Sequence, residues 1–145
     1  MAKPPGFMDL IDPDTRERMR IDRSIWKDRQ QGRRIVYVLG PENGWPCKIG
    51  YAANLLARLH DVQVAHWQKI VVHHCGYCFD KAAALDIEKA AHRLLDANAM
   101  RGEWFDVAPA EALEAVLTAA KAVGADFVVA NMDRVRAVLK KPLAR

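Results

Sequence analysis

The side chain with the clearest chemical consequence is Glu88, a carboxylate on an otherwise apolar stripe. Ala84, Ala91 and Leu95 recur with it at the spacing of one helix face. A carboxylate that faces a protein interior costs free energy unless it pairs with a cation or binds a metal ion. Two interpretations therefore remain open: a buried ion pair between Glu88 and Arg58, or a metal site that includes Glu88.

Tyr37 is the second candidate, because it lies in the middle of an apolar run, residues 35–39. Strand side chains alternate, so Tyr37 shares one face with Ile35 and Leu39, and two valines occupy the other face. A strand that is apolar on both faces is typical of a central, covered strand. A phenol in such a strand must find a hydrogen-bond partner or serve a chemical purpose.

The segment that follows this run predicts a β-hairpin. Residues 40–45 are rich in turn formers, and Asn43-Gly44 is a strong hairpin signal. The second strand, residues 46–50, carries Lys48. We therefore expect Tyr37 on one strand of the hairpin and Lys48 on the other.

The remaining elements predict an α+β fold, with a small, mostly antiparallel three-stranded sheet flanked by helices. Asn54 and Asp80 are the expected N-caps of helices that carry Arg58 and Glu88, respectively. The other elements are expected as a third strand at 68–79, a short strand or extended closing segment at 103–107, and helices at 110–123 and 126–139. We expect a charged arm or helix at 1–31, a core domain at 32–108 and a helical extension at 109–145.

Five elements in order resemble the GIY-YIG nuclease superfamily. They are Val36-Tyr37, Lys48-Ile49-Gly50, Arg58, Glu88 and the closing sequence Gly102-Glu103-Trp104-Phe105. The nearest likeness is to the branch whose second motif reads Lys-Ile-Gly and whose core closes with Gly-Glu-Trp-Phe. The resemblance covers residues 34–108. Ile35 stands where the first motif has glycine, and Lys48 stands where the second has tyrosine.

The resemblance implies a GIY-YIG-like fold and a divalent-metal-dependent endonuclease that hydrolyses phosphodiester bonds in DNA. Tyr37 would accept a proton from water, and Lys48 would help to stabilise the phenolate, because an unperturbed tyrosine has a pKa of about 10. Arg58 and Lys48 would bind the substrate phosphate, with Arg58 on its non-bridging oxygens.

The resemblance also implies a metal ligand, and this ligand is Glu88. It would hold Mg²⁺ or Mn²⁺ as the single protein ligand, with waters filling the rest of the coordination shell. His92, one helical turn beyond Glu88, would hold a metal-bound water or assist proton transfer. Tyr51 is a further catalytic candidate near the phosphate.

Two other functions remain as alternatives, and the first of them is motivated by the glycine and the asparagine that the family motifs carry and this chain lacks. One is a nucleic-acid-binding module with weak or no catalysis, and the other is a protein-interaction module that uses the terminal helices. The net charge of +4 is too small to decide for nucleic acid. The charged segment 1–31 is read either as a solvated helix or as an arm that contacts phosphates.

Three further patterns bear on location and metal content. Neither a signal-peptide core nor a membrane-spanning run is present in the sequence, so we expect a cytoplasmic protein and no membrane partner.

Cys75 and Cys78 beside His73 and His74 suggest a zinc site. In a regular strand, however, these two cysteines face opposite ways, so we interpret them as ordinary strand residues.

Overall fold

The computed structural model of the chain describes residues 34–140, except for the side chains of Val138 and Lys140. The predicted charged arm or helix at 1–31 lies outside the described residues. The segment 34–108, which carries the resemblance, and both predicted C-terminal helices lie within them.

Five strands form one antiparallel sheet in the order β4-β2-β1-β3-β5. Their bounds are β1 Arg34–Pro41, β2 Cys47–Ala52, β3 Ile70–Cys78, β4 Trp104–Phe105 and β5 Val128–Val129. The α+β class is therefore confirmed, and the strand count of three is wrong. β4 is the closing strand expected within 103–107, and β5 is a further two-residue edge strand that is too short to leave a periodic pattern in the sequence.

β5 lies inside the segment predicted as a helix at 126–139, so that prediction is wrong at its start. Val128 and Val129 pair with β3, and the helix α6 begins only at Met132. The side chain of Asn131 accepts a hydrogen bond from the backbone N–H of Arg134 at 3.1 Å and so caps this later start. Gly76 permits the pairing, because a Cβ there would lie 2.5 Å from the carbonyl oxygen of Val128.

The predicted hairpin is confirmed, and β1 is the central strand of the sheet. Tyr37 pairs with Gly50, and Leu39 pairs with Lys48. Paired residues on neighbouring strands project from the same face. Lys48 therefore lies on the same sheet face as Tyr37, whereas Tyr51, which pairs with Val36, lies on the opposite face.

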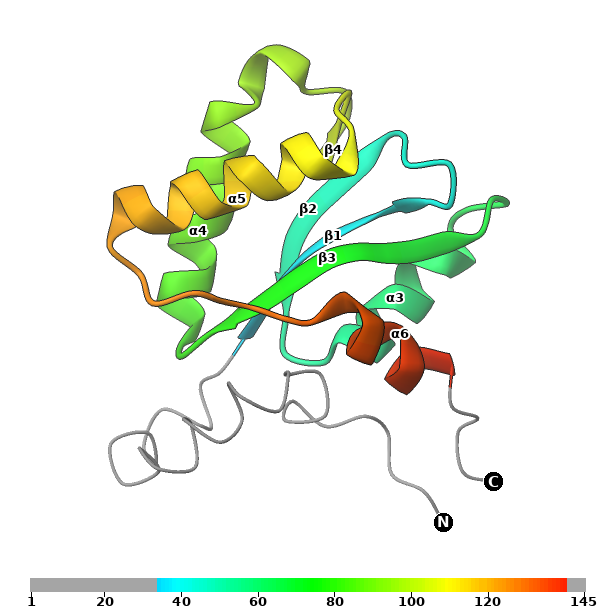
Figure 1. The fold of residues 1–145 in the computed structure, drawn as a ribbon. Coiled ribbons are helices and arrows are strands. Elements are labelled where there is room, and N and C mark those ends of the chain that lie inside the picture. The colour runs from blue at the N-terminus through cyan, green and yellow to red at the C-terminus, as the bar shows by residue number, and fades with distance from the viewer. Residues whose placement is uncertain (1–33, 141–145) are drawn as a thin grey trace.

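Helices cover both faces of the sheet (Figure 1). Their bounds are α3 Leu55–Val64, α4 Lys81–Leu94, α5 Pro109–Val123 and α6 Met132–Lys140, with a 3₁₀ turn at Asp96–Asn98. Asn54 and Asp80 cap α3 and α4 as predicted, each accepting a backbone N–H through its side chain. None of the helices in the described part of the chain is long and apolar enough to cross a lipid bilayer.

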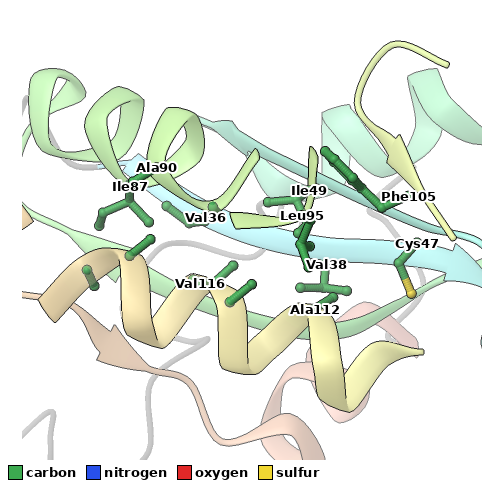
Figure 2. Packing of buried hydrophobic residues seen from close by; sticks show 14 of the residues in the cluster. Val36, Val38, Cys47, Ile49, Ile87, Ala90, Leu95, Phe105, Ala112 and Val116 are labelled. Carbon is green, nitrogen blue, oxygen red and sulfur yellow. The ribbon is translucent and has the colours of Figure 1, made fainter. Parts of the chain in front are cut away.

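Two hydrophobic clusters fill the spaces between the sheet and its helices. The larger one packs Val36, Val38 and Ile49 of the sheet against α4 and α5, as Figure 2 shows. The smaller one surrounds Tyr37 beneath α3 and α6. The alternation predicted for β1 is confirmed, because its two faces enter different clusters.

The strand interpretation of the cysteines is confirmed by the same division. Cys75 belongs to the cluster beneath α3, and Cys78 belongs to the cluster beneath α4 and α5. Because the sheet separates them, they do not form one zinc site. Burial raises the pKa of both thiols to about 12, which favours the neutral thiol over the thiolate that metals bind.

Candidate active site

Tyr37 is enclosed by the sheet and by its hairpin partner. Its side chain is fully buried, and its ring lies over Gly50. A Cβ at position 50 would overlap the Tyr37 hydroxyl and lie 2.7 Å from Cζ. Glycine is therefore required at this point of β2 to leave space for the phenol.

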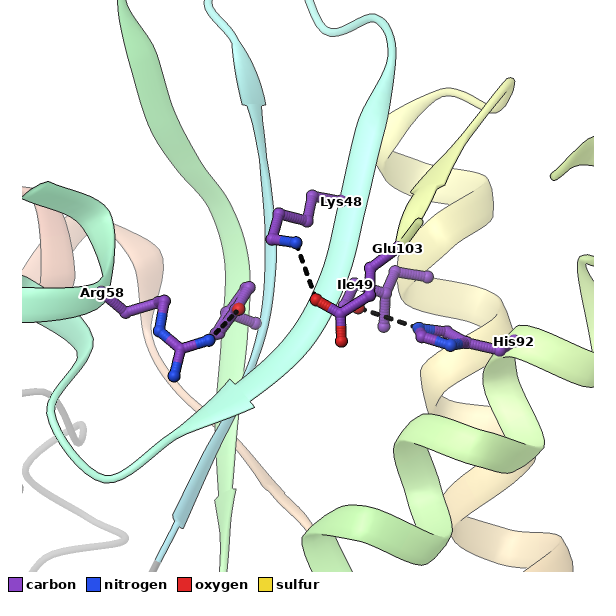
Figure 3. A network of polar contacts seen from close by, with 6 residues as sticks. Lys48, Ile49, Arg58, His92 and Glu103 are labelled. Atoms are coloured by element: carbon purple, nitrogen blue, oxygen red, sulfur yellow. Dashed lines mark hydrogen bonds and ion pairs between the residues drawn. The ribbon is translucent and has the colours of Figure 1, made fainter. Parts of the chain in front are cut away.

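Arg58 supplies the cation next to this phenol. Asn54 starts α3, so Arg58 projects from the first turns of the helix toward the sheet. Its Nη1 donates a hydrogen bond of 3.4 Å to the Tyr37 hydroxyl oxygen (Figure 3). Arg58 thus bonds to Tyr37, and among residues 34–140 no ion pair joins it to Glu88.

The hydroxyl of Tyr37 is neutral at physiological pH. Burial raises its pKa to about 12, against the opposing effect of the Arg58 charge. The carboxylates of Glu103 and Glu88 raise this pKa further. The charges of Arg58, Glu88 and Glu103 therefore all affect the protonation of Tyr37, and the four side chains form one electrostatically coupled site.

Lys48 reaches the site from β2 and pairs with Glu103. Their Nζ and Oε2 atoms are 2.7 Å apart, and both side chains are partly buried. The contact follows from the pairing of β4 with β2, in which Trp104 lies opposite Lys48 and Glu103 immediately precedes Trp104. Figure 3 shows the two side chains meeting in front of β2, with Arg58 on the other side of Lys48.

Glu88 approaches the outer edge of β2 from α4, just beyond the short β4 strand. Its carboxyl group accepts the backbone N–H of Tyr51 and hydrogen-bonds to Glu103. A hydrogen bond between two carboxyl groups requires a proton on one of them. Burial, followed by the charge and the hydrogen bond of Glu103, raises the pKa of Glu88 from 4.5 to about 7.

His92 closes the same edge one helical turn farther along α4. Its Nε2 lies 2.9 Å from the carbonyl oxygen of Ile49, as Figure 3 shows. A carbonyl oxygen only accepts, so Nε2 donates and the neutral ring keeps its lone pair on Nδ1. The ring also packs against Phe105, with a centroid separation of 4.9 Å, which fixes its orientation.

The donor set at this edge fits a divalent cation. One ligand atom from each of Glu88, His92 and Glu103 lies within 4.8 Å of the others. Carboxylate oxygens are the ligands that Mg²⁺ and Mn²⁺ prefer. A cation there would replace the proton that the two carboxyl groups otherwise share, and the carbonyl of Ile49 would orient His92.

The predicted site residues come together around β2, with two differences from the sequence reasoning. Lys48 bonds to Glu103, and the cation bonded to the Tyr37 hydroxyl is Arg58. The ring of Tyr51 packs against the cluster beneath α4 and α5, on the sheet face opposite Tyr37, and it is the backbone of Tyr51 that meets Glu88.

Glu103 is the site residue that the sequence reasoning did not assign. The closing Gly-Glu-Trp-Phe sequence placed it near the end of the core, but nothing local to it indicates a carboxylate partner or a lysine partner. Only the docking of β4 on β2 brings it to both Lys48 and Glu88.

Comparison with known proteins gives one result at the level of the family. A search of curated proteins and a search of solved structures each found no match. The T5orf172 domain family matches residues 34–120, a segment that contains the whole site and extends into α5. This match covers more than half of the chain, and the chain therefore belongs to the T5orf172 domain family.

Proposed function

We propose that this protein is a divalent-metal-dependent endonuclease of the GIY-YIG type, which hydrolyses phosphodiester bonds in DNA. One observation carries the proposal: a phenol, two cations and two carboxylates from separate elements converge on β2. The family supports it, because the T5orf172 domain is associated with GIY-YIG-like, nuclease-type folds.

Arg58 and Lys48 are the groups that would bind the scissile phosphate. Both line one surface hollow beside the site, so a phosphate there contacts two positive charges at once. Arg58 offers a planar fork of donors, which suits the non-bridging oxygens, and Lys48 offers a point charge. Preorganised cations of this kind stabilise the charge that develops in phosphoryl transfer.

Tyr37 would orient the attacking water and take its proton. A phenol with a pKa of about 12 must first give its own proton to solvent before it can take one from the attacking water, so its environment has to change when the metal ion and the substrate bind. Arg58 already lowers this pKa, while Glu88 and Glu103 raise it. The assembled site therefore activates Tyr37 only when the charge of the two carboxylates is offset.

Glu88 and Glu103 would hold the divalent cation, Mg²⁺ or Mn²⁺. Bound there, the ion would offset the negative charge near Tyr37 and stabilise the leaving oxygen. His92, held by Ile49 and Phe105, would keep its Nδ1 lone pair available to the ion or to a water beside it.

The decisive test is incubation of the protein with supercoiled plasmid and with single-stranded DNA. Cleavage is expected with Mg²⁺ or Mn²⁺ and not with chelator. Tyr37→Phe removes only the hydroxyl and should reduce the cleavage rate by about 10²–10⁴-fold, the range of positioned acid–base groups. Equal rates for wild type and Tyr37→Phe, or cleavage that survives chelation, would contradict the proposal.

A nucleic-acid-binding module without catalysis is the second candidate. The Lys48–Glu103 ion pair favours it, because a lysine held at 2.7 Å by a carboxylate is less available to a phenolate or a phosphate. Salt-dependent DNA binding without cleavage under any divalent cation would select this candidate.

A further inference from the structure

A surface hollow of about 440 Å³ opens beside the candidate active site. Lys48 and Arg58 form one part of its lining, and Ala65, His66 and Trp104 form an apolar and aromatic part. The hollow thus joins the two phosphate-binding cations to a surface with no role in the chemistry proposed above.

Aromatic rings dominate that second part. The rings of His66 and Trp104 are tilted against each other, with centroids 5.0 Å apart. Lys48 Nζ lies 5.9 Å from the centroid of the Trp104 ring, so the cations and the rings adjoin. Trp67, the next residue after His66, is 92% exposed. Trp67 is not among the residues that line the hollow, but it follows His66 directly, and its exposed ring offers a further surface on which a base can stack.

The charges of the hollow set the direction in which a nucleotide would lie. A phosphate is attracted to Lys48 and Arg58. It is repelled by Asp61, which also lines the hollow. A base carries no charge, so Asp61 does not repel it, and its N–H groups can donate to the Asp61 carboxylate. The phosphate therefore fits beside Lys48 and Arg58, and the base fits against the rings of His66 and Trp104.

We propose that this hollow binds the base of an unpaired nucleotide next to the scissile phosphate, stacked on His66 and Trp104 and covered by Trp67. This proposal rests on the proposed nuclease function and names its substrate class: DNA that is single-stranded, or locally unpaired, at the cleaved position. A base within a duplex is already stacked on both faces, so it must leave the stack to reach an aromatic side chain.

The test compares strands that carry the same phosphates and differ in their bases. Binding of the full chain is measured by fluorescence anisotropy in chelator, which prevents cleavage. The probes are an oligothymidylate, a fully abasic strand of equal length and a duplex of equal length. Stacking on aromatic side chains is sequence-tolerant and strong. We expect oligothymidylate to bind about 10-fold tighter than the abasic strand.

Three substitutions locate the effect. Trp67→Ala and His66→Ala should each bring the ratio of the two affinities toward one without weakening binding to the abasic strand. Trp67→Phe keeps a ring and should retain most of the preference. Trp45→Phe is the matched control, since Trp45 is half exposed but bonds to Asp106 outside the hollow, and it should leave the ratio unchanged.

The outcomes separate this proposal from the function on which it rests. Equal affinity for oligothymidylate and the abasic strand, or a ratio unchanged in Trp67→Ala and His66→Ala, would overturn the stacking proposal. If metal-dependent cleavage still required Tyr37, the nuclease function would stand. Absence of both cleavage and DNA binding would overturn the two together. Tighter binding to the duplex than to oligothymidylate would also overturn the inferred substrate class.

Discussion

The candidate active site consists of two regions on either side of β2, and they are held in different ways. The phenol region, Tyr37 with Arg58 and Gly50, is fixed by packing, because Tyr37 is fully buried against Gly50 and only Arg58 reaches the surface. The carboxylate region, Glu88 with Glu103, is partly exposed and is held by polar contacts at the edge of the sheet.

This difference determines which region responds to solution conditions. The hydroxyl of Tyr37 has a pKa of about 12 and keeps its proton throughout the neutral range. Glu88 has a pKa of about 7 and changes charge within that range. Because the two carboxylates raise the pKa of Tyr37, the responsive region controls the charge around the fixed one. Sensitivity to pH and to divalent cations should therefore reside in the carboxylate region.

The largest expected effect comes from Glu88→Gln, which removes the titrating group and keeps its size. Metal-dependent cleavage should fall by at least about 10²-fold, because a metal ligand supplies several kcal/mol to the transition state. The melting temperature should stay unchanged or rise slightly. Arg58 bonds to Tyr37, so the substitution leaves no buried arginine without its partner. Plasmid cleavage and melting curves, each with and without Mn²⁺, measure both effects.

The matched control for that experiment is Asp86→Asn, which changes an exposed carboxylate on the same helix. It should retain both cleavage and the rise in melting temperature on adding Mn²⁺. A large loss of stability in Glu88→Gln, together with no Mn²⁺-induced stabilisation of the wild type, would show that the carboxylate region is structural.

Gly50→Ala tests the phenol region through packing alone. The added methyl overlaps the Tyr37 hydroxyl, so the ring or the strand must shift. We expect a loss of about 1–3 kcal/mol in the free energy of unfolding, measured by urea denaturation, and a parallel loss of cleavage. In a Tyr37→Ala background the same substitution should cost less, because the overlapping group is absent. Additive costs in the double variant would contradict the contact.

The pH dependence of stability also tests the carboxylate region, through the titration of Glu88. In the unfolded chain Glu88 titrates near 4.5, and in the folded chain near 7, so the folded state binds more protons between these values. The contribution of Glu88 to the free energy of unfolding should therefore be greatest below pH 4.5 and should decline as the pH rises to about 7. Melting curves should show a weaker decline in Glu88→Gln and in Glu103→Gln. An unchanged slope in both variants would refute the assignment.

The smallest effect concerns the charged segment 1–30, which lies outside the described residues. Deletion of residues 1–30 should weaken DNA binding and reduce its salt dependence, if this charged segment contacts phosphates. The Mn²⁺-induced shift in melting temperature should be unchanged, because Glu88 and Glu103 are retained. Anisotropy titrations at several salt concentrations measure the first effect. Equal salt slopes for the full and shortened chains would assign phosphate binding to the core alone.

Most of the fold, and part of the site, could be predicted from local patterns. The double-faced β1, the hairpin with Tyr37 and Lys48, and the capped helices carrying Arg58 and Glu88 are all present. The stripe of Glu88 faces inward as predicted, since its apolar members are buried. The closing strand β4 was expected within 103–107, whereas β5 was missed and read as part of a helix, because two residues carry no periodicity.

The sequence by itself determined which side chains could do chemistry and on which elements they lie. These properties depend on alternation, helical spacing and capping, all of which act over a few residues. The tertiary structure alone decided the partners: Glu88 meets Glu103 instead of Arg58, Lys48 meets Glu103, and Arg58 meets Tyr37. Each of these contacts joins elements far apart in the chain, and it exists only because strand pairing and packing bring the elements together.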